Sequence, residues 1–93
     1  MISTESRPRL ASKARLRFDR KGERYMLLYP EKGLVLNPTA AEIVRLCTGE
    51  HTVGAIIELL REKYPTQARE ALARQVVEFL CAMADRGLVH GDV

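Results

Sequence analysis

Two stretches near the amino terminus have the apolar patterning of strands in a small sheet. Residues 14–18 alternate, with two apolar side chains on one face and two arginines on the other. A loop at residues 19–23, with Gly22 for a left-handed position, leads into residues 25–29, where both faces are apolar. The sequence therefore predicts a hairpin whose one face lies on helices, while the other is partly covered or contacts a partner.

A third strand is predicted at residues 34–36, after a tight turn at residues 30–33. This strand is short because the chain runs directly from it into a helix. The predicted sheet is therefore small, and an edge strand can keep main-chain N–H and C=O groups free. Such an edge can receive another polypeptide chain.

The first helix has two possible starts in the sequence. Asn37 can cap it with Pro38 in the first turn, or Thr39 can form a capping box with Glu42. Gly49 follows the last apolar position of this helix and is typical of a left-handed terminator.

Two further helices are predicted from the spacing of apolar residues. Thr52 can cap the second, which must stop before Pro65. The third runs from about residue 67 to residue 86, roughly 30 Å, and Gly87 matches a helix stop. It carries two apolar stripes, so one packs inward and the second needs a cover. The stripes are Leu72, Val76, Phe79 and Met83, and Ala73, Val77, Leu80 and Ala84.

Length and composition indicate one folded domain. The chain has 93 residues, 46% hydrophobic and 29% charged, which is ordinary for a globular domain and too short to enclose a large substrate. We expect a flexible basic arm at residues 1–13, a single domain at residues 14–90 and a tail at residues 91–93. No apolar run reaches the roughly 20 residues of a membrane helix, and no secretory signal is recognisable, so the expected location is the cytoplasm.

Positive charge is concentrated in the first quarter of the chain. Residues 1–24 hold eight Lys and Arg against three Asp and Glu, which leaves seven basic and nine acidic residues for the remainder. An acidic partner would therefore be attracted mainly to the amino-terminal arm and first strand, although a solubilising tail gives the same pattern.

No constellation of reactive residues is apparent. The histidines are His51, in a turn, and His90, near the carboxyl end, so no nucleophile has an evident base. Cys47 and Cys81 fall on apolar helix faces and are expected to be buried thiols. The Cys and His spacing lacks the close pairs of structural zinc sites. We therefore predict no enzyme activity, no cofactor and no metal site.

Two binding functions remain open on the residues alone. A small sheet with a helix-turn-helix is typical of winged-helix nucleic-acid-binding proteins, but both long helices mix acidic and basic residues rather than presenting one basic face. A free strand edge beside a surplus apolar helix stripe favours an extended peptide. Alternatively, Val35, Val77 and Leu80 are ordinary core residues, which periodicity alone leaves open.

Several segments, taken in their order and spacing, resemble the PqqD family of pyrroloquinoline quinone biosynthesis over about residues 8–90. They are Pro-Arg-Leu-Ala at 8–11, Arg-Leu-Arg-Phe-Asp at 15–19, Tyr-Met-Leu-Leu-Tyr-Pro-Glu at 25–31, Leu-Val-Leu-Asn-Pro-Thr-Ala-Ala-Glu-Ile at 34–43, Leu-Cys at 46–47, Gly-Glu at 49–50 and the ending at 80–88.

This resemblance implies an α+β, winged-helix-like fold, with a three-stranded antiparallel sheet followed by three helices. It also implies a non-catalytic peptide chaperone, a recognition element for ribosomally made peptides. Such a protein binds the precursor peptide PqqA and presents it to the radical S-adenosylmethionine enzyme PqqE, with no nucleic acid, no membrane and a monomer or weak homodimer expected.

The resemblance also implies a location for the peptide. In relatives the leader segment adds as a further strand beside the third strand, against the third helix. Carried over to this chain, the edge consists of Leu34, Val35, Leu36 and Asn37, and the helix wall of Arg74, Val77, Leu80, Cys81 and Ala84.

Overall fold

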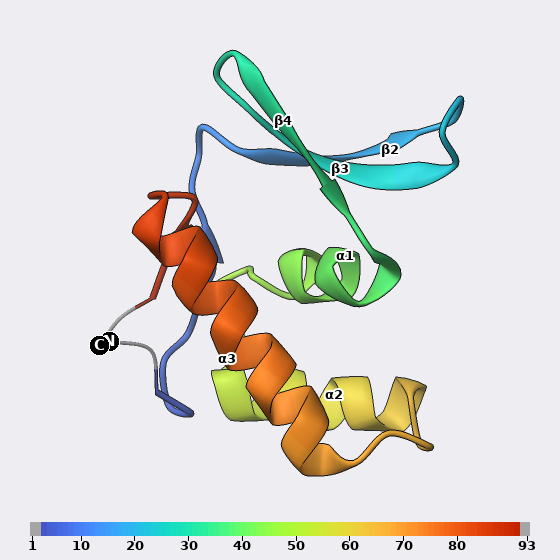
Figure 1. The fold of residues 1–93 in the computed structure, drawn as a ribbon. Helices are drawn as coiled ribbons and strands as arrows, with labels where there is room; N and C mark the ends of the chain where they lie inside the picture. The colour runs from blue at the N-terminus through green and yellow to red at the C-terminus, as the bar shows by residue number, and fades with distance from the viewer. Residues whose placement is uncertain (1–2, 92–93) are drawn as a thin grey trace.

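The fold confirms the predicted α+β class, with a three-stranded antiparallel sheet followed by three helices (Figure 1). The computed structural model describes residues 3–91. Its strands are β1 (Arg9–Leu10), β2 (Arg15–Asp19), β3 (Arg24–Tyr29), β4 (Lys32–Leu36) and β5 (Val89–His90). Its helices are α1 (Pro38–Arg45), α2 (Val53–Lys63) and α3 (Arg69–Asp85).

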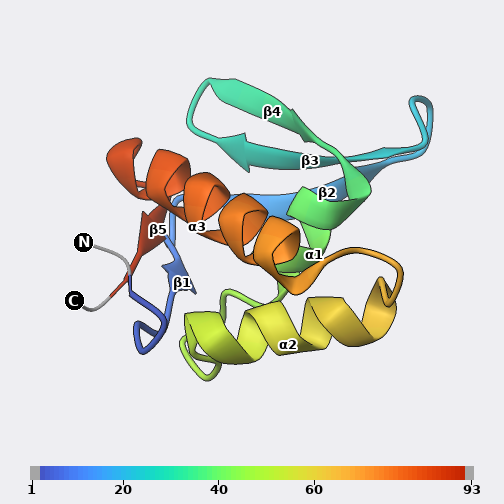
Figure 2. The same ribbon diagram turned by 60° about the horizontal axis from the view of Figure 1, so that its bottom comes forward.

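The main sheet has the order β2-β3-β4, with β3 in the centre. Leu27 of β3 pairs with Leu16 on β2 and with Leu34 on β4, so one face presents a row of leucines. Figures 1 and 2 show the helices gathered on one side of this sheet. Leu27 is fully buried against them, because side chains alternate along a strand and this row faces the helices.

The core is built mainly from the inward faces of α1, α2 and α3. Its fully buried helical side chains recur at three and four residues, as an inward stripe requires. They include Ile43, Val53, Ile56, Ile57, Leu60, Leu72, Val76 and Leu80. Leu72, Val76 and Met83 of the first predicted α3 stripe therefore face the core, together with Leu80 from the second stripe, whereas Phe79 is half-buried at the border of the core.

The structure resolves the two possible starts of α1 in favour of Asn37. Its side-chain oxygen Oδ1 accepts the N–H of Ala40 at 2.7 Å, and Pro38 occupies the first helical turn. The predicted cap of α2 is also confirmed, since Thr52 Oγ1 accepts the N–H of Ala55 at 3.0 Å. Gly87, at φ 70°, ends α3 as predicted.

The Asn37 cap makes a measurable prediction for stability. We expect Asn37→Ala to lower the free energy of unfolding by about 1 kcal/mol, because the N–H of Ala40 loses its acceptor. Urea titration of wild type and variant measures the difference. Asn37→Asp retains an acceptor and should stay within a few tenths of a kcal/mol. Equal stability of the alanine variant would contradict the assigned cap.

Both hairpin loops place a positive φ on a glutamate rather than on a glycine. Glu23 has φ 50° and Glu31 has φ 63°, so the prediction of Gly22 for the left-handed position is wrong. Gly22 instead allows a close approach, because a Cβ there would lie 2.7 Å from Nε of Arg24 and 2.9 Å from Oδ2 of Asp19.

The segment expected to be a flexible arm is partly packed on the domain. β1 pairs with β5, Pro8 is fully buried, and the N–H of Val53 donates to the carbonyl of Ser6 at 2.8 Å. A strand of two residues is too short to show periodicity, which explains why the pattern of residues 1–13 did not predict it. Residues 1–2 and, in the expected tail, residues 92–93 lie outside the described residues.

A candidate binding edge at β4

The strand β4 forms one margin of the main sheet. It pairs with β3, and no other strand in the described part of the chain pairs with it. Within residues 3–91, Gly33 and Val35 make no main-chain hydrogen bond outside the β3–β4 ladder. The outer edge of β4 is therefore open to a further strand.

The hairpin register indicates which main-chain groups face outward. Tyr29 pairs with Lys32 across a two-residue loop, and the pair that closes such a loop is the hydrogen-bonded one. Hydrogen-bonded and non-hydrogen-bonded pairs alternate from there. The N–H and C=O groups of Leu34 and Leu36 consequently face β3, while those of Gly33 and Val35 point away from the sheet.

Side chains of β4 alternate at right angles to these main-chain groups. Leu36 is buried, and Leu34 is half-buried against the core, so both face the helices. Val35 is 52% exposed and lies on the opposite face. The predicted edge residues therefore differ in role. Val35 has main-chain N–H and C=O groups that face outward, whereas the side chains of Leu34 and Leu36 pack the strand against the core.

A groove of about 370 Å³ begins where β4 ends. One wall comes from Asn37 and the first half of α1, and the other wall comes from α3. The α1 side contributes Thr39, Ala40 and Ile43, and the α3 side contributes Gln75, Glu78 and Phe79. An extended chain that pairs with β4 would pass beside this groove, whose floor is apolar and whose rim carries an amide and a carboxylate.

The α3 face in the groove differs from the one implied by the family resemblance. At 100° per residue, Gln75, Glu78 and Phe79 lie on one flank, whereas Val77, Cys81 and Ala84 lie on the other. Arg74 is exposed, Val77, Cys81 and Ala84 are half-buried, and Leu80 is fully buried. Leu80 is thus a core residue, the alternative that periodicity left open.

The groove residues of α3 were missed for a simple reason. Gln75 and Glu78 are polar, so a search for an apolar wall passes over them, and Phe79 falls on the other apolar stripe from Val77 and Leu80 of the predicted wall. The available signal was Phe79 itself, since a large aromatic beside polar residues at neighbouring helix positions marks the border of a buried face.

The ionisable groups near these elements have structural partners rather than reactive ones. Burial raises the pKa of the Cys47 thiol to about 12, so this thiol stays protonated at neutral pH. A hydrogen bond from Lys63 lowers the pKa of Glu42, and the nearby Arg45 acts in the same direction. Glu42 is therefore ionised at neutral pH and joins α1 to α2 through Lys63, 2.8 Å away.

Other chemistry finds little support in the described residues. No group of three or more His, Cys, Asp or Glu side chains within residues 3–91 is placed to hold a metal ion. No helix in the same part of the chain is long and apolar enough to cross a membrane. The open β4 edge and the adjoining groove are thus the features best suited to a ligand.

Sequence comparisons point to a single group of proteins. A family model described as "Coenzyme PQQ synthesis protein D (PqqD)" matches residues 24–89. The PqqA binding protein of Rhodopseudomonas palustris strain HaA2 is 40% identical over 88 residues, covering 95% of this chain and 85% of that protein. The PqqA binding protein of Bradyrhizobium diazoefficiens is 36% identical over 88 residues, covering 95% and 84%.

A solved structure gives the same grouping. The solution structure of the PqqD truncation of Methylobacterium extorquens PqqCD, a functional and stand-alone RiPP recognition element, superposes with a TM-score of 0.83 at 27% identity. It covers 97% of this chain and 95% of that chain. A lasso peptide synthetase B1 complexed with its leader peptide has a TM-score of 0.74 at 21% identity, covering 90% and 98%, and at that identity it supports the fold alone.

Proposed function

The chain belongs to the PqqD family, and from this premise we propose that it is a non-catalytic peptide chaperone of pyrroloquinoline quinone biosynthesis. It binds the precursor peptide PqqA and presents it to the radical S-adenosylmethionine enzyme PqqE. The observation that carries this proposal is the open outer edge of β4 beside the groove between α1 and α3.

In the proposed complex, PqqA adds as a strand to β4. The outward N–H and C=O groups of Gly33 and Val35 exchange hydrogen bonds with the peptide main chain, which supplies affinity without dictating side chains. The groove supplies selectivity, because alternate side chains of an added strand point to the same face. A peptide side chain that reaches Phe79 has an apolar floor, and Glu78 at the rim favours a neighbouring donor or cation.

The proposed helix wall is the flank that carries Gln75, Glu78 and Phe79, since these residues share the groove with Asn37. The flank that carries Arg74, Val77, Cys81 and Ala84 is the alternative wall. The two walls make different predictions for residues close in sequence, so a residue-resolved measurement separates them.

Amide chemical-shift mapping tests the proposal directly. Labelled protein is titrated with unlabelled PqqA, and we expect the largest shifts at Gly33, Val35 and Asn37, followed by Gln75 and Phe79. A peptide of the same composition in scrambled order serves as the control and should leave these amides unshifted.

Two results would contradict the proposal in different ways. Shifts confined to β2, the opposite margin of the sheet, would place the peptide elsewhere. The absence of shifts at saturating PqqA would refute the peptide-binding function itself. Larger shifts at Val77 and Cys81 than at Gln75 and Phe79 would keep the function and select the alternative wall.

A further inference from the structure

The face of the sheet that points away from the helices carries a second apolar surface. By the alternation of side chains, Met26, Leu28 and Val35 lie on the face opposite Leu27. Val35 is 52% exposed, Met26 and Leu28 are half-buried, and none of the three packs against the core. We call Met26, Leu28 and Val35 the outer patch.

The outer patch is continuous across two strands because Gly33 lacks a side chain. A Cβ built at Gly33 would lie 3.1 Å from Cε of Met26 and 3.2 Å from Cδ2 of Leu28. The two β3 side chains therefore lean over Gly33 and cover the space between β3 and β4. A larger residue at position 33 would divide this surface.

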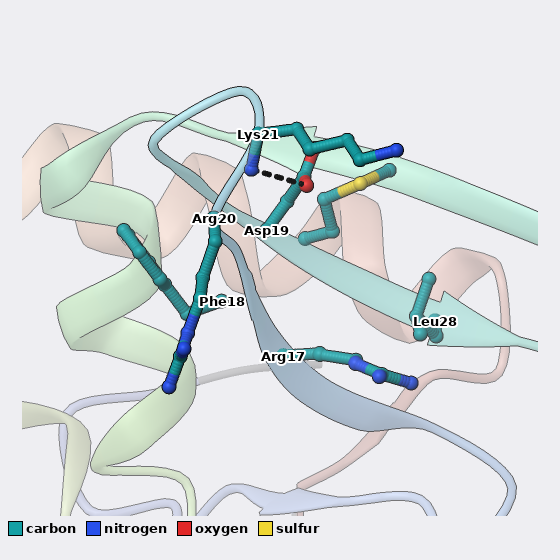
Figure 3. A pocket seen from close by; sticks show the side chains of 7 residues that line it. Arg17, Phe18, Asp19, Arg20, Lys21 and Leu28 are labelled. Carbon is teal, nitrogen blue, oxygen red and sulfur yellow. Dashed lines mark hydrogen bonds between the residues drawn. The ribbon is translucent and has the colours of Figure 1, made fainter.

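Basic side chains border the outer patch along β2 and its hairpin loop. Arg15 pairs with Leu28 and Arg17 with Met26 across the β2–β3 ladder. A hollow of about 490 Å³ lies at this border (Figure 3). Its lining consists of Arg17, Phe18, Asp19, Arg20, Lys21, Met26 and Leu28.

The positive charge of this border is not neutralised within the described residues. Asp19 is the acidic residue of the hollow, and its carboxylate already contacts Nε of Arg24 at 3.4 Å and accepts the N–H of Lys21 at 3.1 Å. Within residues 3–91, Arg15, Arg17, Arg20 and Lys21 form no salt bridge. A partner that covers the outer patch must therefore bring acidic groups to its rim.

We propose that the outer patch docks an acidic surface with an apolar centre on the enzyme that modifies the bound peptide. This inference rests on the proposed function, which requires a second contact besides the peptide. The outer patch lies on the sheet face opposite the groove, so it stays accessible while a peptide occupies the edge of β4. Nucleic acid fits less well, because phosphates need cations across the surface and leave three apolar side chains without partners.

The test uses the charge reversals R15E/R17E in the full-length protein, with purified cognate PqqE as the probe. We expect affinity for PqqE to fall at least about tenfold at low salt, since two attractive pairs become repulsive. Affinity for PqqA should change by less than about twofold, because both residues lie on β2, away from the peptide edge. Val35→Ser, which reduces the apolar centre while keeping the main-chain N–H, should also weaken PqqE binding.

The matched control is K13E/R61E, which changes the net charge equally at exposed positions on a loop and on α2. It should bind PqqE nearly as tightly as wild type. Circular dichroism confirms that all variants are folded.

The following results overturn the inference. The first is an affinity for PqqE that is the same in R15E/R17E as in the wild type, and the second is an equal loss of affinity in the control variant. The third is a wild-type protein that does not bind PqqE. The fourth is a DNA duplex that binds the wild type and loses affinity in R15E/R17E, while the affinity for PqqE stays unchanged. Failure of the proposed function gives a different result, because the wild type would then not bind PqqA. The affinity for PqqE is measured without the peptide, so it tests the docking surface alone.

Discussion

Proline at position 35 is expected to abolish most of the affinity for PqqA without unfolding the domain. Val35→Pro removes an N–H that points away from β3, and its ring occupies the position of the incoming strand. Loss of one hydrogen bond together with this steric conflict amounts to ~2–3 kcal/mol, or about 30- to 150-fold in Kd. Isothermal titration calorimetry with PqqA measures the effect.

The control for this prediction is Val35→Ala, which shortens the side chain but keeps the N–H. Because that side chain lies on the sheet face opposite the groove, the alanine variant should bind PqqA within about twofold of wild type. Circular dichroism should show unchanged helix content in both variants, since edge strands tolerate proline. Wild-type affinity in the proline variant would rule out strand addition at β4.

Truncation of Leu27 is expected to have the largest effect on stability. This side chain is fully buried in the central strand, and both of its cross-strand neighbours are leucines. Leu27→Ala removes three buried carbon atoms and leaves a cavity, so the free energy of unfolding should fall by about 3 kcal/mol. For a domain of this size that is a large fraction of the total stability.

Urea denaturation followed by circular dichroism measures this loss. The matched control is Leu59→Ala on α2, where the side chain is 38% exposed and the expected loss is below about 1 kcal/mol. A similar loss in both variants would contradict the assignment of Leu27 to the centre of the core.

Sequence patterns predicted the regular elements because each has enough length to show its period. α2 and α3 contain several turns of apolar spacing, β2 alternates between apolar and basic residues, and β3 is a short apolar run between two loops. Short elements gave no such signal. The two-residue β1 depends on distant β5 and on Cys47, whose carbonyl accepts the N–H of Leu10 at 3.0 Å, so only tertiary contacts define it.

In the candidate site, the position of the strand could be predicted from the sequence, but the flank of α3 that lines the groove could not. Leu34–Asn37 stand out because a short strand runs directly into a capped helix, which leaves an edge. The flank of α3 that borders the groove depends on where α1 packs, and periodicity carries no information about that neighbour. Likewise, Asn37 and Thr39 are both good caps, and the choice follows from how far β4 extends.

The pairing of Arg9 with His90 brings the beginning and the end of the folded domain together. In Figure 2, β1 and β5 lie side by side below one end of α3, on the other side of this helix from β4. A protein domain fused next to β1 or β5 would thus leave the outer edge of β4 unobstructed. The same geometry makes this chain suited to genetic fusion or circular permutation with the open edge of β4 intact.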